Sequence, residues 1–364
     1  MRVFDRFLLF CALAGILTSG AFAASPSTAW KENIEPDEAT QFAGFATRIQ
    51  EIIKKLNKDG DPHRGFHAKP HGAMSGELKI LPGLPEYAQF GMFKDAKTYP
   101  CYVRFSNGVG VQVSDARPDV RGFAVKVVGV PGKKLLDGEE SALTQDFLST
   151  NSPVSLARNA KQFMAFANAN VNQLTLPFTL GRELGAREAA RITAFLATSL
   201  ARPIRSMAVE TFWSGAPIKL GPYAVKFVWK PVGADAAHGI LPSRDGLRQD
   251  LHDRLAKGDL RYDLYLQFFV SEQLTPVEDS SVEWLEKDAP PVKVGELTIA
   301  KRDLDAARAQ KEEDFVNSLA FSPWHCTEDL RPIGHTMRAR KVVYKASSEL
   351  RRHAPEPTGS EHFE

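Results

Sequence analysis

Cysteine and net charge are both scarce in this chain of 364 residues. The three cysteines, Cys11, Cys101 and Cys326, include no CxxC pair, so their spacing gives no sign of a cysteine metal site. Cys101 and Cys326 could form a disulfide in an oxidising compartment, or each could be a buried free thiol. Lys and Arg number 46 and Asp and Glu 44, a net charge of +2. This balance suggests neither nucleic acid nor an acidic polymer as a partner.

The apolar run at the N-terminus is too short to cross a membrane. It extends from Phe7 to Leu17, whereas a spanning helix needs ~20 residues. Two arginines precede it and Ala21-Phe22-Ala23 follows it, which is the pattern of a secretory signal. We therefore predict a signal peptide at residues 1–23, export to the periplasm of a bacterium, and no stable membrane anchor.

No repeat, low-complexity tract or linker divides the remaining chain. A short arm and a helix are expected at residues 24–59, because apolar residues recur at helical spacing from Phe42 to Leu56 and Gly60 ends the pattern. Residues 60–353 are expected to form one domain, followed by a polar tail at 354–364.

Most of that domain alternates between strand and helix patterns. The β-rich runs are Leu78–Leu81, Tyr99–Ser106, Gly122–Val128, Ala208–Trp213, Tyr223–Lys230, Asp263–Ser271 and Lys293–Ala300. Helical patterns cover residues 154–202, 303–319 and 336–353. Many strands interrupted by helical insertions predict the α+β class, with an antiparallel β-barrel wrapped by helices.

The helix expected near the C-terminus carries an informative set of side chains. There is neither Gly nor Pro in residues 336–352, and Arg340, Tyr344 and Arg351 are spaced to share one face. A phenol becomes a good iron ligand when a nearby cation stabilises its phenolate, and Arg340 lies one turn from Tyr344. Tyrosinate is a rare haem ligand. The alternative is a solvent-facing helix surface with a half-buried ring.

Three more motifs lie in the N-terminal half. They are Arg-Gly-Phe-His-Ala-Lys at residues 64–69, Val-Arg-Phe-Ser at 103–106, and Arg-Gly-Phe-Ala-Val-Lys at 121–126. Together with the C-terminal Arg-x-x-x-Tyr and the arginine seven residues after that tyrosine, they resemble the haem catalases in order and separation. The likeness covers roughly residues 60–352.

The resemblance implies a catalase-type β-barrel with bound haem b, which is iron protoporphyrin IX. His67 would be the catalytic acid and base on the side where peroxide binds, and Ser106 would hold its other ring nitrogen. Tyr344 would be the metal ligand, with its negative charge stabilised by Arg340.

The remaining candidates would bind the cofactor. Arg64, Arg104 and Arg351 would pair with the haem propionates, a bidentate task that suits a guanidinium group. Phe66 and Phe163 would pack against the porphyrin, and the plain alternative for both is a role as core aromatics.

The chain departs from catalases where they carry an asparagine that orients a second peroxide. The matching segment is Thr150-Asn151-Ser152-Pro153, which puts Thr150 at that place and the catalytic candidate Asn151 one position later. Efficient disproportionation of hydrogen peroxide is therefore not expected. A short exported chain of this kind resembles the catalase-related peroxidases, which reduce organic hydroperoxides. The expected partners are a peroxide and a small-molecule electron donor, with weak catalase activity in addition.

Three alternatives remain open. The first is isomerisation or dehydration of fatty-acid hydroperoxides, of the allene-oxide-synthase type, which consumes no electron donor. The second is a periplasmic haem-binding protein without catalysis, which would need no proton shuttle such as His67. The third is a haem-free barrel that binds an apolar ligand. His71, His325 and His335 lie near the motifs and are expected to be structural.

Overall fold

The computed structural model describes residues 25–57, 63–172, 174–201, 203–233 and 243–364. The predicted signal peptide at residues 1–23 lies outside this range, as does Gly60, the expected end of the first helix. Among the described residues, no helix has the length and apolar character that crossing a membrane requires.

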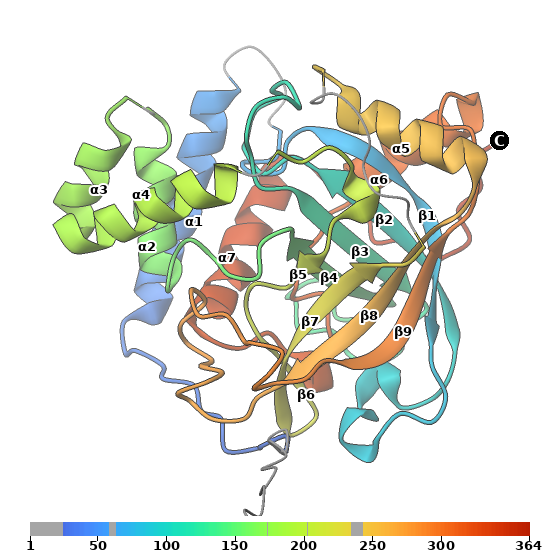
Figure 1. The fold of residues 1–364 in the computed structure, drawn as a ribbon, viewed down its shortest axis with the longest axis horizontal. Helices are drawn as coiled ribbons and strands as arrows, with labels where there is room; N and C mark the ends of the chain where they lie inside the picture. Colours follow the sequence, from blue (N-terminus) through green and yellow to red (C-terminus); the bar gives the residue numbers. More distant parts are fainter. Residues whose placement is uncertain (1–24, 58–62, 173, 202, 234–242) are drawn as a thin grey trace, which may run out of the picture.

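A nine-stranded antiparallel sheet forms the body of the molecule (Figure 1). Its strands are β1 (Pro70–Ile80), β2 (Thr98–Ser106), β3 (Gly122–Val128), β4 (Thr144–Thr150), β5 (Phe212–Trp213), β6 (Ile218–Leu220), β7 (Tyr223–Pro231), β8 (Leu260–Phe268) and β9 (Val292–Ile299). They follow the order β5-β4-β3-β2-β1-β9-β8-β7-β6. Strand β5 also pairs with β7, which closes the sheet into a barrel and leaves β6 as a short additional strand.

The helices lie around this barrel. They are α1 (Glu38–Leu56), α2 (Ala160–Ala169), α3 (Leu176–Leu184), α4 (Ala186–Ala201), α5 (Gly246–Lys257), α6 (Ala307–Ser318) and α7 (His335–Leu350). Helices α1 and α7 pack against each other beside the barrel, and α2, α3 and α4 form a group next to them (Figure 1). Helices α5 and α6 pack on β1. The predicted α+β barrel wrapped by helices is therefore confirmed.

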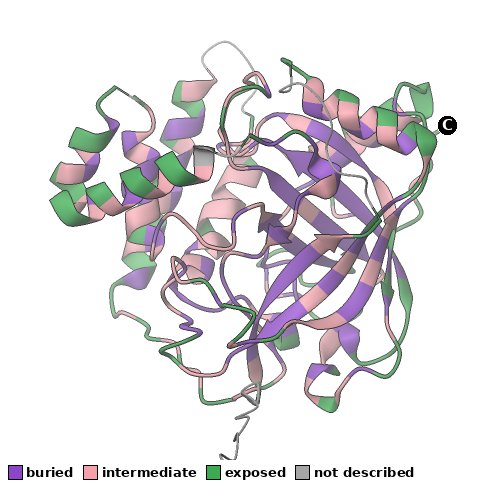
Figure 2. Ribbon diagram, in the orientation of Figure 1, coloured by how far each residue is buried: buried purple, intermediate pink, exposed green. Residues whose placement is uncertain are grey.

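Large aromatic side chains fill the inside of the barrel. The rings of Phe105 and Phe123 lie 4.7 Å apart, and those of Phe123 and Phe212 lie 4.9 Å apart. Trp229 meets Phe123 edge-on at 5.7 Å. Buried residues, purple in Figure 2, follow one another along the strands of the barrel. Because the interior is packed, a ligand must bind outside the barrel wall.

Alternation along the strands decides what the outer wall presents. Successive side chains of a strand point to opposite faces, so Val103 and Phe105 of β2 belong to the packed interior while Arg104 and Ser106 point outward. The same rule puts Lys126 of β3 on the outer face, two residues beyond Ala124.

Several elements differ from the sequence prediction. The run Ala208–Trp213 is not one strand, because a 3₁₀ turn occupies Met207–Val209 and β5 contains only Phe212 and Trp213. The helical stretch 154–202 consists of three separate helices. Strand β4 and helix α5 were not predicted. Strand β4 reads Thr-Gln-Asp-Phe-Leu-Ser-Thr, and its polar residues conceal its pairing with β3.

Candidate active site

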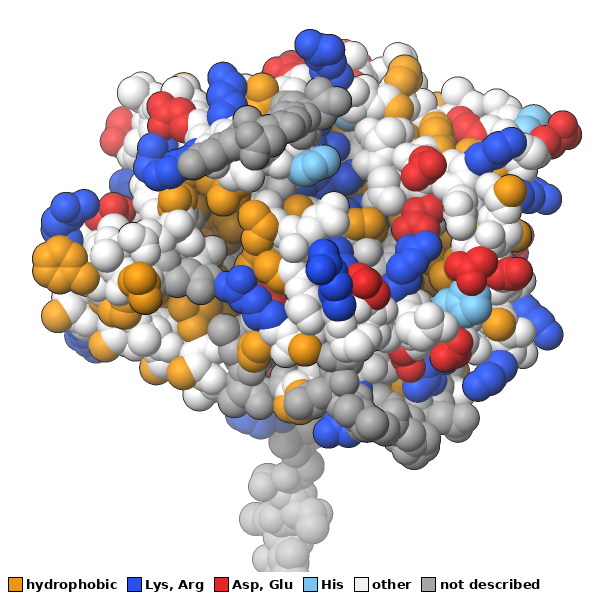
Figure 3. Space-filling model, turned by 90° about the horizontal axis from the view of Figure 1, so that it is seen from above, with side chains coloured by type: hydrophobic (Ala, Val, Ile, Leu, Met, Phe, Trp, Pro, Cys, Tyr) orange, Lys and Arg blue, Asp and Glu red, His pale blue; other side chains and the backbone are white. Residues whose placement is uncertain are grey.

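A cavity of about 680 Å³ lies between the outer face of β2, β3 and β4 and helices α1, α2 and α7. All the sequence-predicted site residues except Asn151 line it: Arg64, Phe66, His67, Arg104, Ser106, Phe163, Arg340, Tyr344 and Arg351. Residues from α3 and α4 extend the lining. Seen from above, hydrophobic side chains gather on the side where α3 and α4 lie, at the left of Figure 3.

His67 lies in the segment that leads into β1, and its backbone is in the left-handed region with a φ of 57°. This conformation is unfavourable for a residue with a side chain, so the surroundings must hold it. The amide of His67 donates to the carbonyl of Gly108 at 2.9 Å, and the amide of Ala68 donates to that of Val109 at 3.1 Å. These bonds fix the direction of the imidazole toward the cavity.

The hydrogen bonds of His67 decide which ring nitrogen carries the proton. Its Nδ1 lies 2.6 Å from the backbone carbonyl oxygen of Asn107 and 3.1 Å from the hydroxyl oxygen of Ser106. A carbonyl oxygen can only accept, so Nδ1 carries the proton and donates it. In the described part of the chain, Nε2 makes no hydrogen bond. The neutral ring therefore presents the lone pair of Nε2 to the cavity.

Burial and the nearby positive charge of Arg104 lower the pKa of His67 to about 4. The carbonyl of Asn107 opposes this shift but does not cancel it. His67 is therefore neutral at physiological pH and can accept a proton through Nε2.

Gly122 at the start of β3 leaves room for this ring. A Cβ atom at residue 122 would lie 2.4 Å from His67 Nδ1 and 2.7 Å from Ser106 Oγ. Both distances are below any normal contact, so only glycine is compatible with the observed position of the imidazole.

Three arginines around the cavity have no carboxylate partner among the described residues. Arg64 donates to the backbone carbonyls of Asn317 at 2.9 Å and Leu319 at 2.8 Å. Arg104 donates from Nε to the side-chain oxygen of Asn317 at 2.9 Å. The Nε atom of Arg351 is buried and makes no hydrogen bond to any described residue.

Burial and mutual repulsion lower the pKa values of these three arginines. Burial, with the charges of Arg104 and Arg351, lowers the pKa of Arg64 well below its ordinary value. Burial lowers the pKa of Arg104 to about 9 and that of Arg351 to about 10. Buried cations with no counter-charge are costly, so an anionic ligand in the cavity would relieve them.

Tyr344 reaches the cavity from α7, and the start of that helix explains its position. Gly334 precedes the helix with a φ of 84°, and a Cβ there would lie 2.4 Å from the carbonyl oxygen of Val277. Arg338 then ties the helix to Glu32 at 2.7 Å and to Glu38 at 2.6 Å. These contacts hold α7 against α1 and the N-terminal arm.

The guanidinium of Arg340 lies over the ring of Tyr344, 5.6 Å from its centroid. One of its nitrogens is 3.4 Å from the sulfur of Met337. The sequence predicted a contact between Arg340 and Tyr344, and in the structure it is a cation–π contact with the face of the Tyr344 ring. Phe66 and Phe163 meet elsewhere in the cavity wall, with ring centroids 5.3 Å apart.

Asn151 does not line the cavity with the other predicted site residues. Its side-chain oxygen accepts from the amide of Arg121 at 2.7 Å, and its side-chain nitrogen donates to Glu210 at 3.3 Å. Thr150 pairs with Gly122 across β3 and β4 and lines the cavity instead. A shift of one residue along an extended chain turns the side chain to the other face. The prediction that placed Asn151 in the site needs this correction.

Two participants were missed by the sequence analysis. The backbone carbonyl of Asn107 fixes the tautomer of His67, and no side-chain pattern signals a carbonyl. Asn317, in the last turn of α6, binds both Arg64 and Arg104 but lies far from either in the chain. Only the fold brings them together.

The chain is similar to known catalases over part of its sequence and in its fold. A family model described as Catalase matches residues 27–174. No curated protein matches the chain. Among solved structures, a bacterial catalase is 20% identical with a TM-score of 0.62, and the match covers 92% of this chain and 64% of that chain. A fungal catalase is 21% identical with a TM-score of 0.62, covering 94% and 67%.

Catalase A from Saccharomyces cerevisiae is 18% identical with a TM-score of 0.60, covering 83% of this chain and 63% of that chain. The chain thus has the catalase fold and spans less than two thirds of the bacterial and yeast structures. The family match covers residues 27–174, and the shared fold covers 83–94% of this chain.

Proposed function

We propose that this chain, as a member of the haem catalase superfamily, is a haem-dependent peroxidase that reduces organic hydroperoxides to alcohols with electrons from a small-molecule donor. The observation that carries the proposal is His67, a neutral imidazole with a free Nε2 that faces the same cavity as Tyr344. A protein that only carried haem would need an iron ligand and contacts to the propionates. It would have no use for an oriented base.

The residues around the cavity fit haem b. Among the residues that the structure describes, no carboxylate pairs with Arg64, Arg104 or Arg351, and the buried Nε of Arg351 lacks an acceptor that a propionate would supply. Tyr344 would bind the iron, with the charge of Arg340 next to its ring. When bound, an iron porphyrin supplies the electron transfer that O–O bond cleavage requires.

His67 would move one proton during the reaction. Its Nε2 would accept the proton of the hydroperoxide OOH group and return it to the oxygen that leaves with the organic group. That transfer makes an alcohol the leaving group. In the complete reaction one hydroperoxide, two electrons and two protons give one alcohol and one water. The bond from Nδ1 to the carbonyl of Asn107 keeps the ring in the orientation and tautomer that this transfer needs.

The preference for peroxidase over catalase chemistry rests on Thr150 and Asn151. Thr150 faces the cavity, and the amide of Asn151 is engaged with Arg121 and Glu210. An amide that could orient a second peroxide is therefore missing from that place, and we propose that catalase activity is weak. We also propose export to a bacterial periplasm, which rests on the sequence of residues 1–23.

The test is the purified chain with haem supplied. We expect a Soret absorption band, reduction of cumene hydroperoxide to cumyl alcohol with two electrons taken from the donor dye per hydroperoxide, and little oxygen release from hydrogen peroxide. The variant His67→Ala should keep the haem and lose the reaction. Hydroperoxide consumption without donor oxidation would show an isomerase or dehydratase. A chain that binds no haem would refute the proposal.

A further inference from the structure

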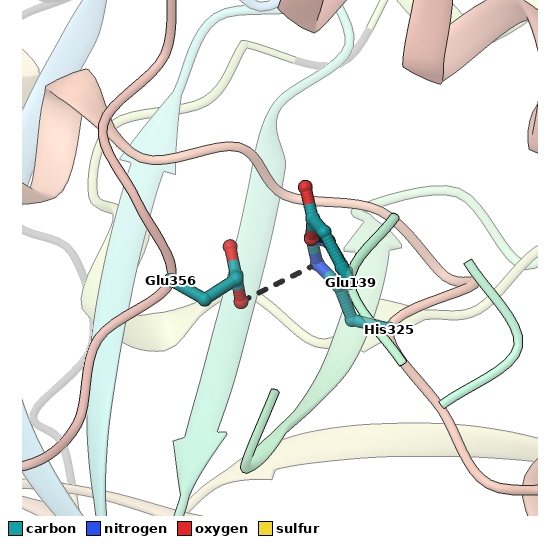
Figure 4. Close-up of side chains that lie close together, drawn as sticks. All are labelled: Glu139, His325 and Glu356. Carbon is teal, nitrogen blue, oxygen red and sulfur yellow. Dashed lines mark hydrogen bonds and ion pairs between the residues drawn. The ribbon is translucent and has the colours of Figure 1, made fainter. Parts of the chain in front are cut away.

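A second cluster of titratable groups lies on the outer face of the barrel, beside the candidate active site. The ammonium group of Lys126 in β3 is 2.9 Å from Asp146 in β4 and 2.6 Å from Glu356 in the C-terminal segment. His325 completes the cluster, with Nδ1 2.8 Å from Asp146 and Nε2 2.5 Å from Glu139. Figure 4 shows Glu139, His325 and Glu356 close together.

The cluster already contains its cation. The Lys126 ammonium lies between the carboxylates of Asp146 and Glu356, at 2.9 Å from the first and 2.6 Å from the second. Both ring nitrogens of His325 are within hydrogen-bond distance of carboxylates and donate to them when the ring is protonated. The arrangement is therefore a buried ion network, with two cations and three carboxylates.

The C-terminal segment, residues 354–364, is bound to the barrel. The amide of Ala354 donates to the carbonyl of Ser318 at 3.0 Å, and Ala354 forms a bridge with Leu319. Glu356 then accepts from the hydroxyl of Thr144 at 2.5 Å as well as from Lys126. The segment thus connects the end of α6 with the ion network.

Residues 317–325 connect the end of α6 with His325 of the ion network, and they form part of the wall of the active-site cavity. It supplies the acceptors for Arg64 and Arg104 through Asn317 and Leu319. Phe321 lines the cavity, and the ammonium of Lys126 lies 5.5 Å from the centroid of its ring.

The ion network holds the same stretch from the other side. The amide of Ser322 donates to Asp146 at 2.9 Å. His325 is fixed by Asp146 and Glu139. A displacement of residues 317–325 would therefore disturb the hydrogen bonds of the ion network and those of Arg64 and Arg104.

We propose that residues 354–364 act as a clasp, in which Glu356, through Lys126, Asp146 and His325, positions residues 317–325 and with them the anion-binding arginines Arg64 and Arg104. The proposal rests on the proposed function, because the anion that those arginines bind is taken to be a haem propionate. Glu356 is thereby a positioning residue that touches neither cofactor nor substrate.

The chain provides a matched control for Glu356. Glu361 lies in the same segment and accepts a hydrogen bond from Tyr102 at 2.9 Å, outside the ion network. Glu356→Gln removes the charge beside Lys126, and Glu361→Gln makes the same chemical change next to a neutral hydroxyl.

The first measurement is amide hydrogen exchange of the full-length apoprotein. In Glu356→Gln we expect peptides covering residues 317–325 to exchange about tenfold faster than in the wild type, since a lost charge-assisted hydrogen bond lowers the local opening free energy. In Glu361→Gln the same peptides should change by less than about twofold. Equal exchange in the two variants would overturn the proposal. If Glu356→Gln does not fold, Glu356→Asp should give an intermediate rate, and a wild-type rate there would overturn it.

The second measurement is the rate at which the loaded protein loses haem to an excess of a haem-free acceptor globin. We expect about tenfold faster loss in Glu356→Gln than in Glu361→Gln, as Arg64 and Arg104 lose their fixed positions. Equal rates would contradict the link to the arginines. If the wild type binds no haem, the proposed function fails, and hydrogen exchange still decides whether the clasp exists.

Discussion

The Nδ1 atom of His67 lies 2.6 Å from the backbone carbonyl oxygen of Asn107. This distance is shorter than the 3.1 Å between the same nitrogen and the Ser106 hydroxyl. The carbonyl belongs to the backbone, so no side-chain substitution removes it, and it forces the proton onto Nδ1. The orientation of the proposed catalytic base is therefore a property of the chain fold around residues 106–108.

Ser106→Ala should consequently have a small effect. The Asn107 carbonyl still fixes the tautomer, so we expect kcat/KM for cumene hydroperoxide to fall less than about tenfold, the usual value of one neutral hydrogen bond. His67→Ala should reduce it by ~10²–10⁴-fold, because the proton shuttle is gone. Steady-state kinetics of both variants measure this difference. A loss in Ser106→Ala as large as that in His67→Ala would show that the hydroxyl dominates.

Gly122→Ala should have a large effect although it adds one methyl group. The new Cβ would lie 2.4 Å from His67 Nδ1, so the imidazole must move. We expect a loss of about 1–3 kcal/mol in unfolding free energy and of about 10²-fold in activity. A Cβ added to Gly44 in α1 would meet no atom within 4 Å. Gly44→Ala is therefore the control, and it should keep full activity. Thermal unfolding and kinetics of the two variants make the comparison.

The pH dependence of the reaction should report the low pKa of His67. Burial and Arg104 lower that pKa to about 4. Above this value the ring is neutral and can accept the hydroperoxide proton, and below it the ring is protonated and cannot. We expect kcat/KM to fall as the pH drops through about 4, and to be level from there toward neutrality. An acid limb near the ordinary histidine value of ~6.5 would mean that another group controls the reaction.

The site residues that the sequence predicts lie within short motifs. His67, Arg104 and Tyr344 each belong to such a motif, and the barrel followed from the strand patterns between them. Contacts between distant parts of the chain carry no such signal. Strand β4 was missed because its polar Asp146 is compensated by Lys126 and by His325, which is 179 residues away.

Asn151 shows the limit of reading register from sequence. Its position differs by one from that of Thr150, and the structure shows that Thr150, which pairs with Gly122, is the one that lines the cavity. An extended strand turns its side chain over with every residue, so a candidate one residue away points to the opposite face. The pairing of β3 and β4 is not readable from either strand alone.

Replacing Arg351 should weaken haem binding without lowering the stability of the apoprotein. The buried Nε of Arg351 has no hydrogen-bond partner in the described part of the chain, and burial lowers the pKa of Arg351 to about 10. Arg351→Met should weaken haem binding by about tenfold to a hundredfold, since a charged hydrogen bond to a propionate is lost. The apoprotein should be equally stable or more stable, because an uncompensated buried charge is removed. Haem titration and unfolding of the apoprotein test the two signs. A strongly destabilised apoprotein would show that Arg351 has a structural partner.

The stability contributed by His325 should depend on pH in a defined direction. Burial and Lys126 oppose protonation of this ring, but the carboxylates of Asp146 and Glu139 outweigh them and raise its pKa to about 9. Glu356 also faces the ring, with an oxygen 3.7 Å from Nδ1. His353 contacts the cluster through Glu139. A folded-state pKa above the unfolded value means that the stabilisation is complete below pH ~6.5 and disappears as the pH rises through about 9.

Other buried groups make the protein more stable as the pH rises. The effect of His325 must therefore be measured as the difference in unfolding free energy between the wild type and a His325 variant. Burial lowers the pKa of Lys226 to about 7 and that of Lys134 to about 8, and deprotonation of both favours the folded state as the pH rises. We therefore compare the wild type with His325→Gln, which keeps those lysines. The wild type should be more stable by on the order of 2–3 kcal/mol at pH 6, and the gap should close by pH 10. Urea unfolding at the two pH values measures it. A gap that stayed constant or widened would mean that His325 is not protonated in the folded protein.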